Sequence, residues 1–151
     1  MQKIVAILPM RDGSQRVINK NSRVINGKHL YEYIIDKLLN FNLISKIIIN
    51  TDIEMVHEKY ISNNKIILVR RNNNLKGNCD INLVISDSIK NIEADLFIQV
   101  HATNPLFKST SLKKAIIKPS LYKERLLFKD RFSSKLKFFE DLIKSKAKYN
   151  K

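Results

Sequence analysis

The feature that most constrains the fold of this chain is the alternation of short β-branched runs with longer amphipathic segments. Four runs have the composition and length of buried strands: KIVAIL (3–8), KIIINTD (46–52), KIILVRR (65–71) and ADLFIQVHATNPL (94–106). Four segments carry apolar residues at helical spacing: HLYEYIIDKLLNFNLI (29–44), IEMVHEKYI (53–61), INLVISDSIKNI (81–92) and STSLKKAII (109–117). The alternation predicts βαβ units and, with right-handed crossovers, an α/β, Rossmann-like sandwich with a mainly parallel sheet.

A polar cluster lies at the carboxyl end of each of the four expected strands. They are Arg11–Asn21, Asn50–Asp52, Arg70–Arg71 and Gln99–Asn104. Because the carboxyl ends of parallel strands meet at one edge of a sheet, and ligands of open α/β sheets bind outside that edge, we expect these clusters to form one site.

The first of these clusters has the ingredients of a polyphosphate site. Arg11, Arg16 and Lys20 surround Gly13 and Ser14 directly after the first expected strand. Gly13 permits a left-handed turn with close backbone approach, and Lys and Arg side chains both bind phosphate oxygens. The loop matches neither the GxGxxG nor the GxxxxGK[ST] phosphate motif. A solvated loop with incidental cations is the alternative interpretation.

Several other polar residues are expected to have structural or marginal roles. Asp52 is expected to support a strand end or cap a helix, and Cys79 to be an inert, partly buried thiol. His101 lies at the edge of the expected site, while His29 and His57 are expected on the surface of helices.

The net charge of +14 is concentrated in the last third of the chain. From Lys108 onward there are fourteen Lys and Arg against four Asp and Glu, a balance of +10, whereas residues 1–107 carry +4. The strand pattern decays after Pro119, and SSKLKFFEDLIKSKAKY (133–149) is expected to form one amphipathic helix with no strand after it. A basic tail of this kind is more typical of a solvated surface than of a nucleic-acid-binding face.

The expected location is the cytoplasm. One cysteine cannot form an internal disulfide, and the N-terminal apolar run is too short for a signal peptide. No segment approaches the roughly 20 apolar residues that a membrane-spanning helix needs.

Four stretches, in this order, carry a resemblance to a known family. They are ILPMRDGSQRVINKN (7–21), IIINTD (47–52), VRRNNNLKGN (69–78) and LFIQVHATNPL (96–106). They resemble the Pro-x-Arg-x-Gly-Ser-x-Arg…Lys-Asn, Ser-Thr-Asp, Arg-Pro and Leu-Gln-x-Thr-x-Pro-Leu signatures of the sugar-acid cytidylyltransferases, which include the CMP-sialic acid synthetases. Asn50 replaces Ser in the second motif, and Asn72 replaces Pro in the third. The resemblance covers residues 3–118 and implies a nucleotidyltransferase fold.

The resemblance also implies a reaction, in which the anomeric hydroxyl of a sugar acid attacks the α-phosphate of CTP and releases pyrophosphate. Arg11 and Lys20 would then be catalytic, because they neutralise charge that builds up on the phosphates. The implied nucleotide contacts are Gly13, Ser14, Arg16, Asn21 and Arg71, with Asn21 and Arg71 on the cytidine side. The implied substrate contacts are Gln99, Thr103 and Asn104. Mg²⁺ is the expected cofactor, near Gln99, and a homodimer is the expected assembly.

The last third of the chain departs from the family pattern. Nothing after Pro119 resembles the family's dimerisation excursion or its late Asp-x-Asp pair, which Asp130 and Asp141 do not reproduce. Phe107 also stands where Arg commonly follows the Pro-Leu pair. We therefore expect a cytidylyltransferase-like domain over 1–118 with an incomplete C-terminal part, a basic helical tail over 119–151, and weak CTP binding with slow turnover at most. The alternatives are a catalytically inactive nucleotide-binding relative and a basic nucleic-acid-binding module.

Overall fold

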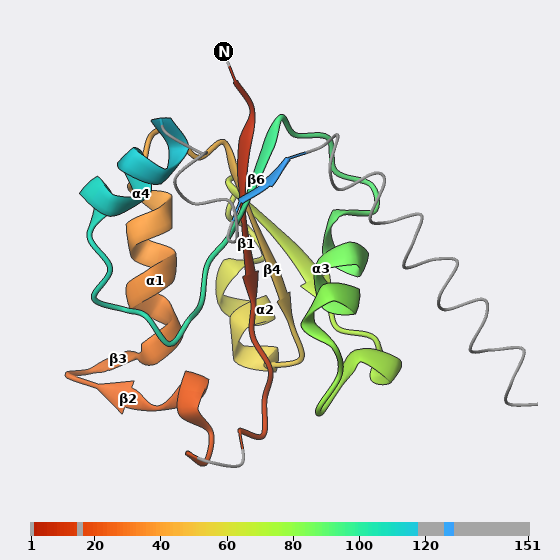
Figure 1. The fold of residues 1–151 in the computed structure, drawn as a ribbon. Coiled ribbons are helices and arrows are strands. Elements are labelled where there is room, and N and C mark those ends of the chain that lie inside the picture. Colours follow the sequence, from red (N-terminus) through yellow and green to blue (C-terminus); the bar gives the residue numbers. More distant parts are fainter. Residues whose placement is uncertain (1, 15–16, 118–125, 129–151) are drawn as a thin grey trace, which may run out of the picture.

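The computed structural model describes residues 2–14, 17–117 and 126–128 of the chain. A five-stranded sheet has the order β5-β4-β1-β6-β7 (Figure 1). Its strands are β1 (Ile4–Pro9), β4 (Lys46–Thr51), β5 (Ile66–Arg70), β6 (Leu96–Gln99) and β7 (Leu126–Phe128). The first four strands are parallel, as the sequence predicts, and the crossover between β5 and β6 moves the chain to the other side of β1.

The helices occupy both faces of the sheet. They are α1 (Leu30–Leu39), α2 (Glu54–Tyr60), α3 (Ile81–Ile89) and α4 (Ser109–Ile117), all at segments with predicted helical spacing. Two short 3-10 helices, η1 (Lys20–Ser22) and η2 (Asn73–Leu75), and a hairpin of β2 (Val24–Ile25) and β3 (Lys28–His29) belong to the connections. No helix in the described part of the chain is long and apolar enough to cross a membrane.

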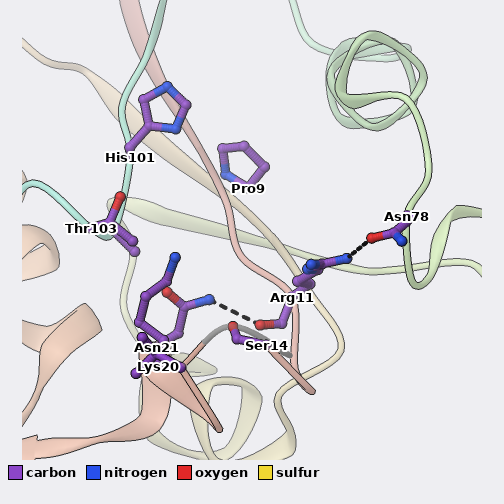
Figure 2. A pocket seen from close by; sticks show the side chains of 10 residues that line it. Pro9, Arg11, Ser14, Lys20, Asn21, Asn78, His101 and Thr103 are labelled. Atoms are coloured by element: carbon purple, nitrogen blue, oxygen red, sulfur yellow. Dashed lines mark hydrogen bonds between the residues drawn. The ribbon is translucent and has the colours of Figure 1, made fainter.

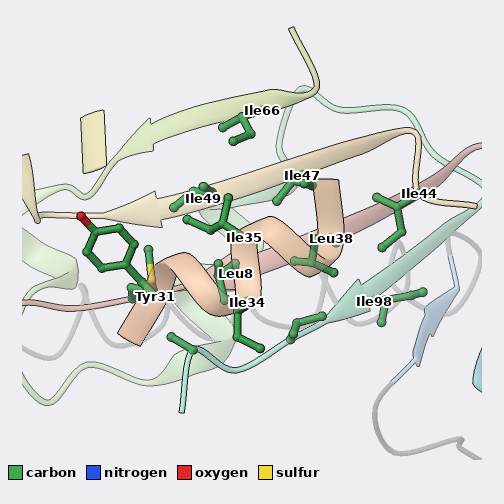
Figure 3. Packing of buried hydrophobic residues seen from close by; sticks show 14 of the residues in the cluster. Leu8, Tyr31, Ile34, Ile35, Leu38, Ile44, Ile47, Ile49, Ile66 and Ile98 are labelled. Atoms are coloured by element: carbon green, nitrogen blue, oxygen red, sulfur yellow. The ribbon is translucent and has the colours of Figure 1, made fainter. Parts of the chain in front are cut away.

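The strand side chains divide into two cores because successive residues of a strand point to opposite faces. Leu8 and Ile49 belong to the core that also contains apolar residues of α1, α2 and α4. Ile7 and Ile48, one position away in each strand, belong to the core that contains residues of α3. Figure 3 shows α1 packed on the strands, with Ile34, Ile35 and Leu38 near Leu8 and Ile49. Burial on both faces explains why these strands are nearly continuous apolar runs.

Two expectations concern the tail of the chain. Strand β7 lies within the tail where a helix was expected, and it pairs antiparallel with β6 through Leu96 opposite Phe128. Its three residues LLF are too few to show a period in the sequence. The helix expected over 133–149, and with it most of the basic tail, lies outside the described residues.

The two histidines expected on the surface lie further inside. His57 is buried on α2, and its Nε2 atom is 3.1 Å from the carbonyl oxygen of Thr51. His29 is half-buried before α1, where its ring stacks on Tyr31 with the ring centroids 5.3 Å apart. A backbone carbonyl within reach of a ring nitrogen allows a histidine to be buried without an unpaired polar group.

Candidate functional site

The loop after β1 makes a sharp, internally bonded turn at the carboxyl edge of the sheet. Gly13 has φ +63°, the left-handed conformation that the sequence analysis expected of it. Asp12 accepts the Gly13 N–H at 2.9 Å, and Asp52, just after β4, accepts the Asp12 N–H at 2.7 Å. Asp52 therefore supports the loop from the neighbouring strand end, which is the structural role expected for it.

A first cavity of about 480 Å³ opens beside this loop (Figure 2). Its lining comes from the loop, from η1, from the segment before α3 and from the residues after β6: Pro9, Arg11, Ser14, Val17, Lys20, Asn21, Asn78, His101, Ala102 and Thr103. Its volume is within the range of small-molecule sites, and Arg11 and Lys20 supply two cations. An anionic ligand of moderate size suits this cavity.

A second cavity of about 410 Å³ lies next to the first, between the end of β5 and α3. It is lined by Pro9, Arg11, Arg71, Leu75, Gly77, Asn78, Cys79, Ile81 and Val84. Pro9, Arg11 and Asn78 line both cavities, so Arg11 lies on the wall between them. The second cavity combines aliphatic side chains with a guanidinium group, an environment that suits a planar, partly polar group.

Arg11 reaches across the site rather than into solvent. Its Nη1 donates to the carbonyl oxygen of Gly77 at 2.6 Å and to Oδ1 of Asn78 at 2.9 Å. Asn21, which is buried, donates through Nδ2 to the carbonyl oxygen of Arg11 at 2.9 Å. Figure 2 shows the bond from Arg11 to Asn78 and the bond from Asn21 to Arg11. The loop after β1 is thereby tied to η1 on one side and to the segment before α3 on the other.

Asn21 has one further property that points to a ligand. Its Oδ1 atom is buried and has no hydrogen-bond partner among the residues that the structure describes. An unsatisfied buried acceptor costs about 1–3 kcal/mol. Asn21 lines the first cavity, so a donor group of a bound molecule can satisfy this oxygen there.

Arg71, at the end of β5, is 6% exposed and is held by Asn50 of β4. Its Nε donates to Asn50 Oδ1 at 2.9 Å, and its Nη2 donates to the Asn50 carbonyl oxygen at 3.0 Å. Burial lowers the pKa of the guanidinium, and nearby Asp52 opposes this shift. Because an arginine guanidinium stays protonated across the physiological pH range, Arg71 remains a cation facing the second cavity.

The structure brings most of the predicted residues together. Ser14, Lys20 and Thr103 line the first cavity with Arg11 and Asn21, and His101 joins them from the site edge where it was expected. Cys79 is half-buried in the wall of the second cavity, which confirms its expected partial burial, and its inertness stays a prediction. Arg70, which was expected in the same polar cluster as Arg71, instead forms an exposed ion pair with Glu54.

Four predicted residues do not contribute to the observed lining: Gly13, Arg16, Gln99 and Asn104. Gln99 is half-buried at the end of β6 and Asn104 is in an exposed turn, and neither lines a cavity described here. Gln99 has the strand parity of Phe97, whose side chain belongs to the core beside α3. Arg16 lies outside the described residues. The roles of all four stay predictions.

The sequence analysis did not single out Gly77 and Asn78 as site residues. Both follow η2, and Gly77 has φ +68°, so the backbone turns there before α3 begins. The available signal was Gly77 itself, because an isolated glycine before a helical segment marks a turn. Gly77 and Asn78 gain their role by accepting hydrogen bonds from the tip of the Arg11 side chain. The spacing of residues in the sequence does not predict such a contact.

The described residues supply few protein ligands for Mg²⁺ at this site. Within residues 2–14, 17–117 and 126–128, no group of three or more His, Cys, Asp or Glu side chains is arranged to hold a metal ion. Asp12 and Asp52 each use an oxygen on a backbone N–H of the loop. Mg²⁺ at phosphate sites is commonly held by one or two carboxylates together with phosphates and water. The described residues thus offer isolated carboxylates and no ready-made cage.

Solved structures of several nucleotidyltransferases are similar to this fold. A CMP:2-keto-3-deoxy-manno-octonic acid synthetase complexed with CTP superposes with a TM-score of 0.63 and 21% identity, over 76% of this chain and 46% of that chain. A cytidylyltransferase from Leptospira borgpetersenii serovar Hardjo-bovis gives a TM-score of 0.61 and 18% identity, over 77% of this chain and 48% of that chain. The chain therefore spans about half of the length of these neighbours and shares their fold.

Sequence comparison defines the family. N-acylneuraminate cytidylyltransferase of Escherichia coli O18:K1:H7 is 40% identical over 52 residues, which are 34% of this chain and 12% of that protein. The family model described as cytidylyltransferase matches residues 5–124, a range that contains both cavities and all four sequence motifs. The chain belongs to the cytidylyltransferase family.

Proposed function

We propose that this protein transfers CMP from CTP to a sugar acid of the sialic or octulosonic type and releases pyrophosphate. The observation that carries the proposal is the pair of adjoining cavities separated by Arg11, one with Lys20 in its wall and the other with Arg71. A nucleotide has a polyanionic end and a planar base, and the two cavities match these two parts in charge and lining. Family membership, together with the partial identity to an N-acylneuraminate cytidylyltransferase, supports the choice of CTP and of a sugar acid.

The triphosphate is assigned to the first cavity. In the transfer, the anomeric oxygen of the acid forms a bond to the α-phosphorus, the bond from that phosphorus to the bridging oxygen breaks, and the hydroxyl proton passes to solvent. Negative charge then increases on the phosphate oxygens. Lys20 supplies a compact positive charge and Arg11 a guanidinium group in the same wall, and preorganised charge of this kind lowers the barrier to phosphoryl transfer.

The cytidine end is assigned to the wall that the two cavities share, with Asn21 on the side of the first cavity and Arg71 on the side of the second. Cytosine carries an amino donor next to ring acceptors, and Asn21 has a buried acceptor without a partner among the described residues. Arg71 supplies donors from the second cavity. Uracil presents a carbonyl where cytosine presents its amino group, so a site arranged in this way rejects UTP by leaving buried polar groups unpaired.

Mg²⁺ is proposed to enter with the triphosphate. When bound, it would neutralise phosphate charge and orient the α-phosphate for displacement. Asp12, within the loop that leads into the first cavity, and Asp52, which accepts the Asp12 N–H, are the side chains of this chain that would help to hold the ion.

The reaction is tested by measuring pyrophosphate release from CTP and Mg²⁺ with a panel of sialic-type and octulosonic acids. We expect slow release that requires both CTP and one class of acid, since preorganised cations support the transfer even where the remaining contacts are few. Lys20→Ala is expected to abolish it.

A no-acceptor reaction controls for simple CTP hydrolysis. If CTP binds and no acid in the panel supports release, the transferase proposal is wrong and a nucleotide-binding role without transfer remains.

A further inference from the structure

We propose that Asn78 is a positioning residue, which fixes the Arg11 guanidinium on the wall shared by the two cavities before any ligand arrives. This inference rests on the proposed function for the identity of the ligand, a nucleoside triphosphate. Its geometric basis is independent of that identity. No family signature used in the sequence analysis gives Asn78 a role.

Arg11 is held at both ends. Both hydrogens of its Nη1 have acceptors, the Gly77 carbonyl oxygen at 2.6 Å and Asn78 Oδ1 at 2.9 Å. At the other end, the Arg11 carbonyl oxygen accepts from Asn21 Nδ2 at 2.9 Å. A long, flexible side chain is thereby restricted at its tip and at its backbone.

Three donors of the Arg11 guanidinium remain for a ligand. A guanidinium group has five N–H donors, and Nη1 contributes two of them. Nε and Nη2 contribute the other three, and none of these has an acceptor within the described residues. Arg11 lines both cavities, so these donors lie where a ligand that spans the two cavities would pass. Asn78 occupies one edge of the guanidinium and leaves the others for phosphate oxygens.

The backbone on both sides of Asn78 is fixed, which allows this residue to act as an anchor. The preceding Gly77 turns the backbone with φ +68°, and Asp80, two residues later, caps α3 by accepting the Asn82 N–H at 2.9 Å. The anchor therefore lies in a short segment between a 3-10 helix and a capped helix. Ordering an arginine during folding removes the rotamer entropy that binding would otherwise cost.

A double-mutant cycle separates positioning from a direct contact. CTP affinity is measured by calorimetry for wild type, Asn78→Ala, Arg11→Ala and the double variant. If Asn78 acts through Arg11, Asn78→Ala weakens binding by about three- to tenfold, the scale of one hydrogen bond. In the Arg11→Ala background the same change then has less than about a twofold effect, because the coupled partner is gone. Equal effects in both backgrounds would overturn the proposal.

A matched variant controls for the loop itself. Asn74→Ala removes an exposed asparagine of η2 that does not line either cavity. It is expected to bind CTP as wild type does, and an effect as large as that of Asn78→Ala would assign the effect to the loop instead. Unfolding in urea is measured for each variant, so that loss of folding is recognised.

A second readout does not depend on the nucleotide. The ¹⁵N relaxation of the Arg11 Nε–H group, assigned by its absence from the Arg11→Ala spectrum, reports the order of the guanidinium without ligand. We expect this order to fall in Asn78→Ala and to be kept in Asn78→Asp, since a carboxylate accepts the same bond. Unchanged order in Asn78→Ala would contradict the proposal even if CTP does not bind, whereas CTP failing to bind wild type would contradict the proposed function alone.

Discussion

Replacing Ile49 by alanine is expected to lower the free energy of unfolding by about 2–5 kcal/mol. Ile49 is in β4, is 0% exposed, and belongs to the core between the sheet and α1. Truncation removes buried methyl groups and leaves a cavity that the two packed layers cannot fully close. Urea denaturation followed by circular dichroism measures the loss as a shift of the midpoint.

The chain offers a control with the same substitution. Ile61, just after α2, is 77% exposed, so Ile61→Ala is expected to change stability by less than about 0.5 kcal/mol. Equal effects at positions 49 and 61 would contradict the two-layer core described above.

Replacing Asn50 by alanine is expected to cost about 2–3 kcal/mol of stability, although only a small polar side chain is removed. Asn50 is fully buried and its Oδ1 accepts from Arg71 Nε at 2.9 Å. Without this oxygen, a buried cation loses one of the two acceptors that it has among the described residues, and breaking a buried charged interaction is costly. Urea denaturation measures the loss, and Asn42→Ala, at an exposed position before β4, is the control with no expected effect.

A second variant identifies the cause of that loss. Adding Arg71→Met to Asn50→Ala removes the stranded cation together with its acceptor. Because removing both partners of a buried pair is less costly than removing one, the double variant is expected to be more stable than Asn50→Ala. A double variant that is less stable, by the sum of the two single losses, would show that the pair is not coupled.

The parallel part of the fold was predictable from sequence because burial on both faces leaves a local signature. Ile47–Ile49 and Ile66–Val69 are continuous apolar runs, and each became a strand of the parallel sheet. Strand order has no such signature, since it depends on which buried faces pack together. Strand β7 was missed because three residues cannot show a period. Its partner β6 is also distant in the sequence, with Leu126 opposite Ile98 and Phe128 opposite Leu96.

The site was predictable to the extent that it follows from strand ends. Arg11, Lys20 and Asn21 were expected together, and they line one cavity. The contribution of Asn78 was not predicted, because it depends on where the tip of Arg11 lies after folding. The expected surface position of His57 was wrong for a related reason, since the carbonyl oxygen that its ring contacts belongs to a separate element.

The central claim, that the first cavity binds the triphosphate of CTP, is tested most directly by titrating CTP into wild type, Lys20→Ala and Lys28→Ala. Lys28 carries the same charge but pairs with Asp36 on the surface and lines neither cavity. We expect wild type and Lys28→Ala to bind alike, and Lys20→Ala to bind more weakly by about 1.5–3 kcal/mol, the scale of a charge-assisted hydrogen bond. The absence of CTP binding to wild type, or equal losses in the two lysine variants, would contradict the claim.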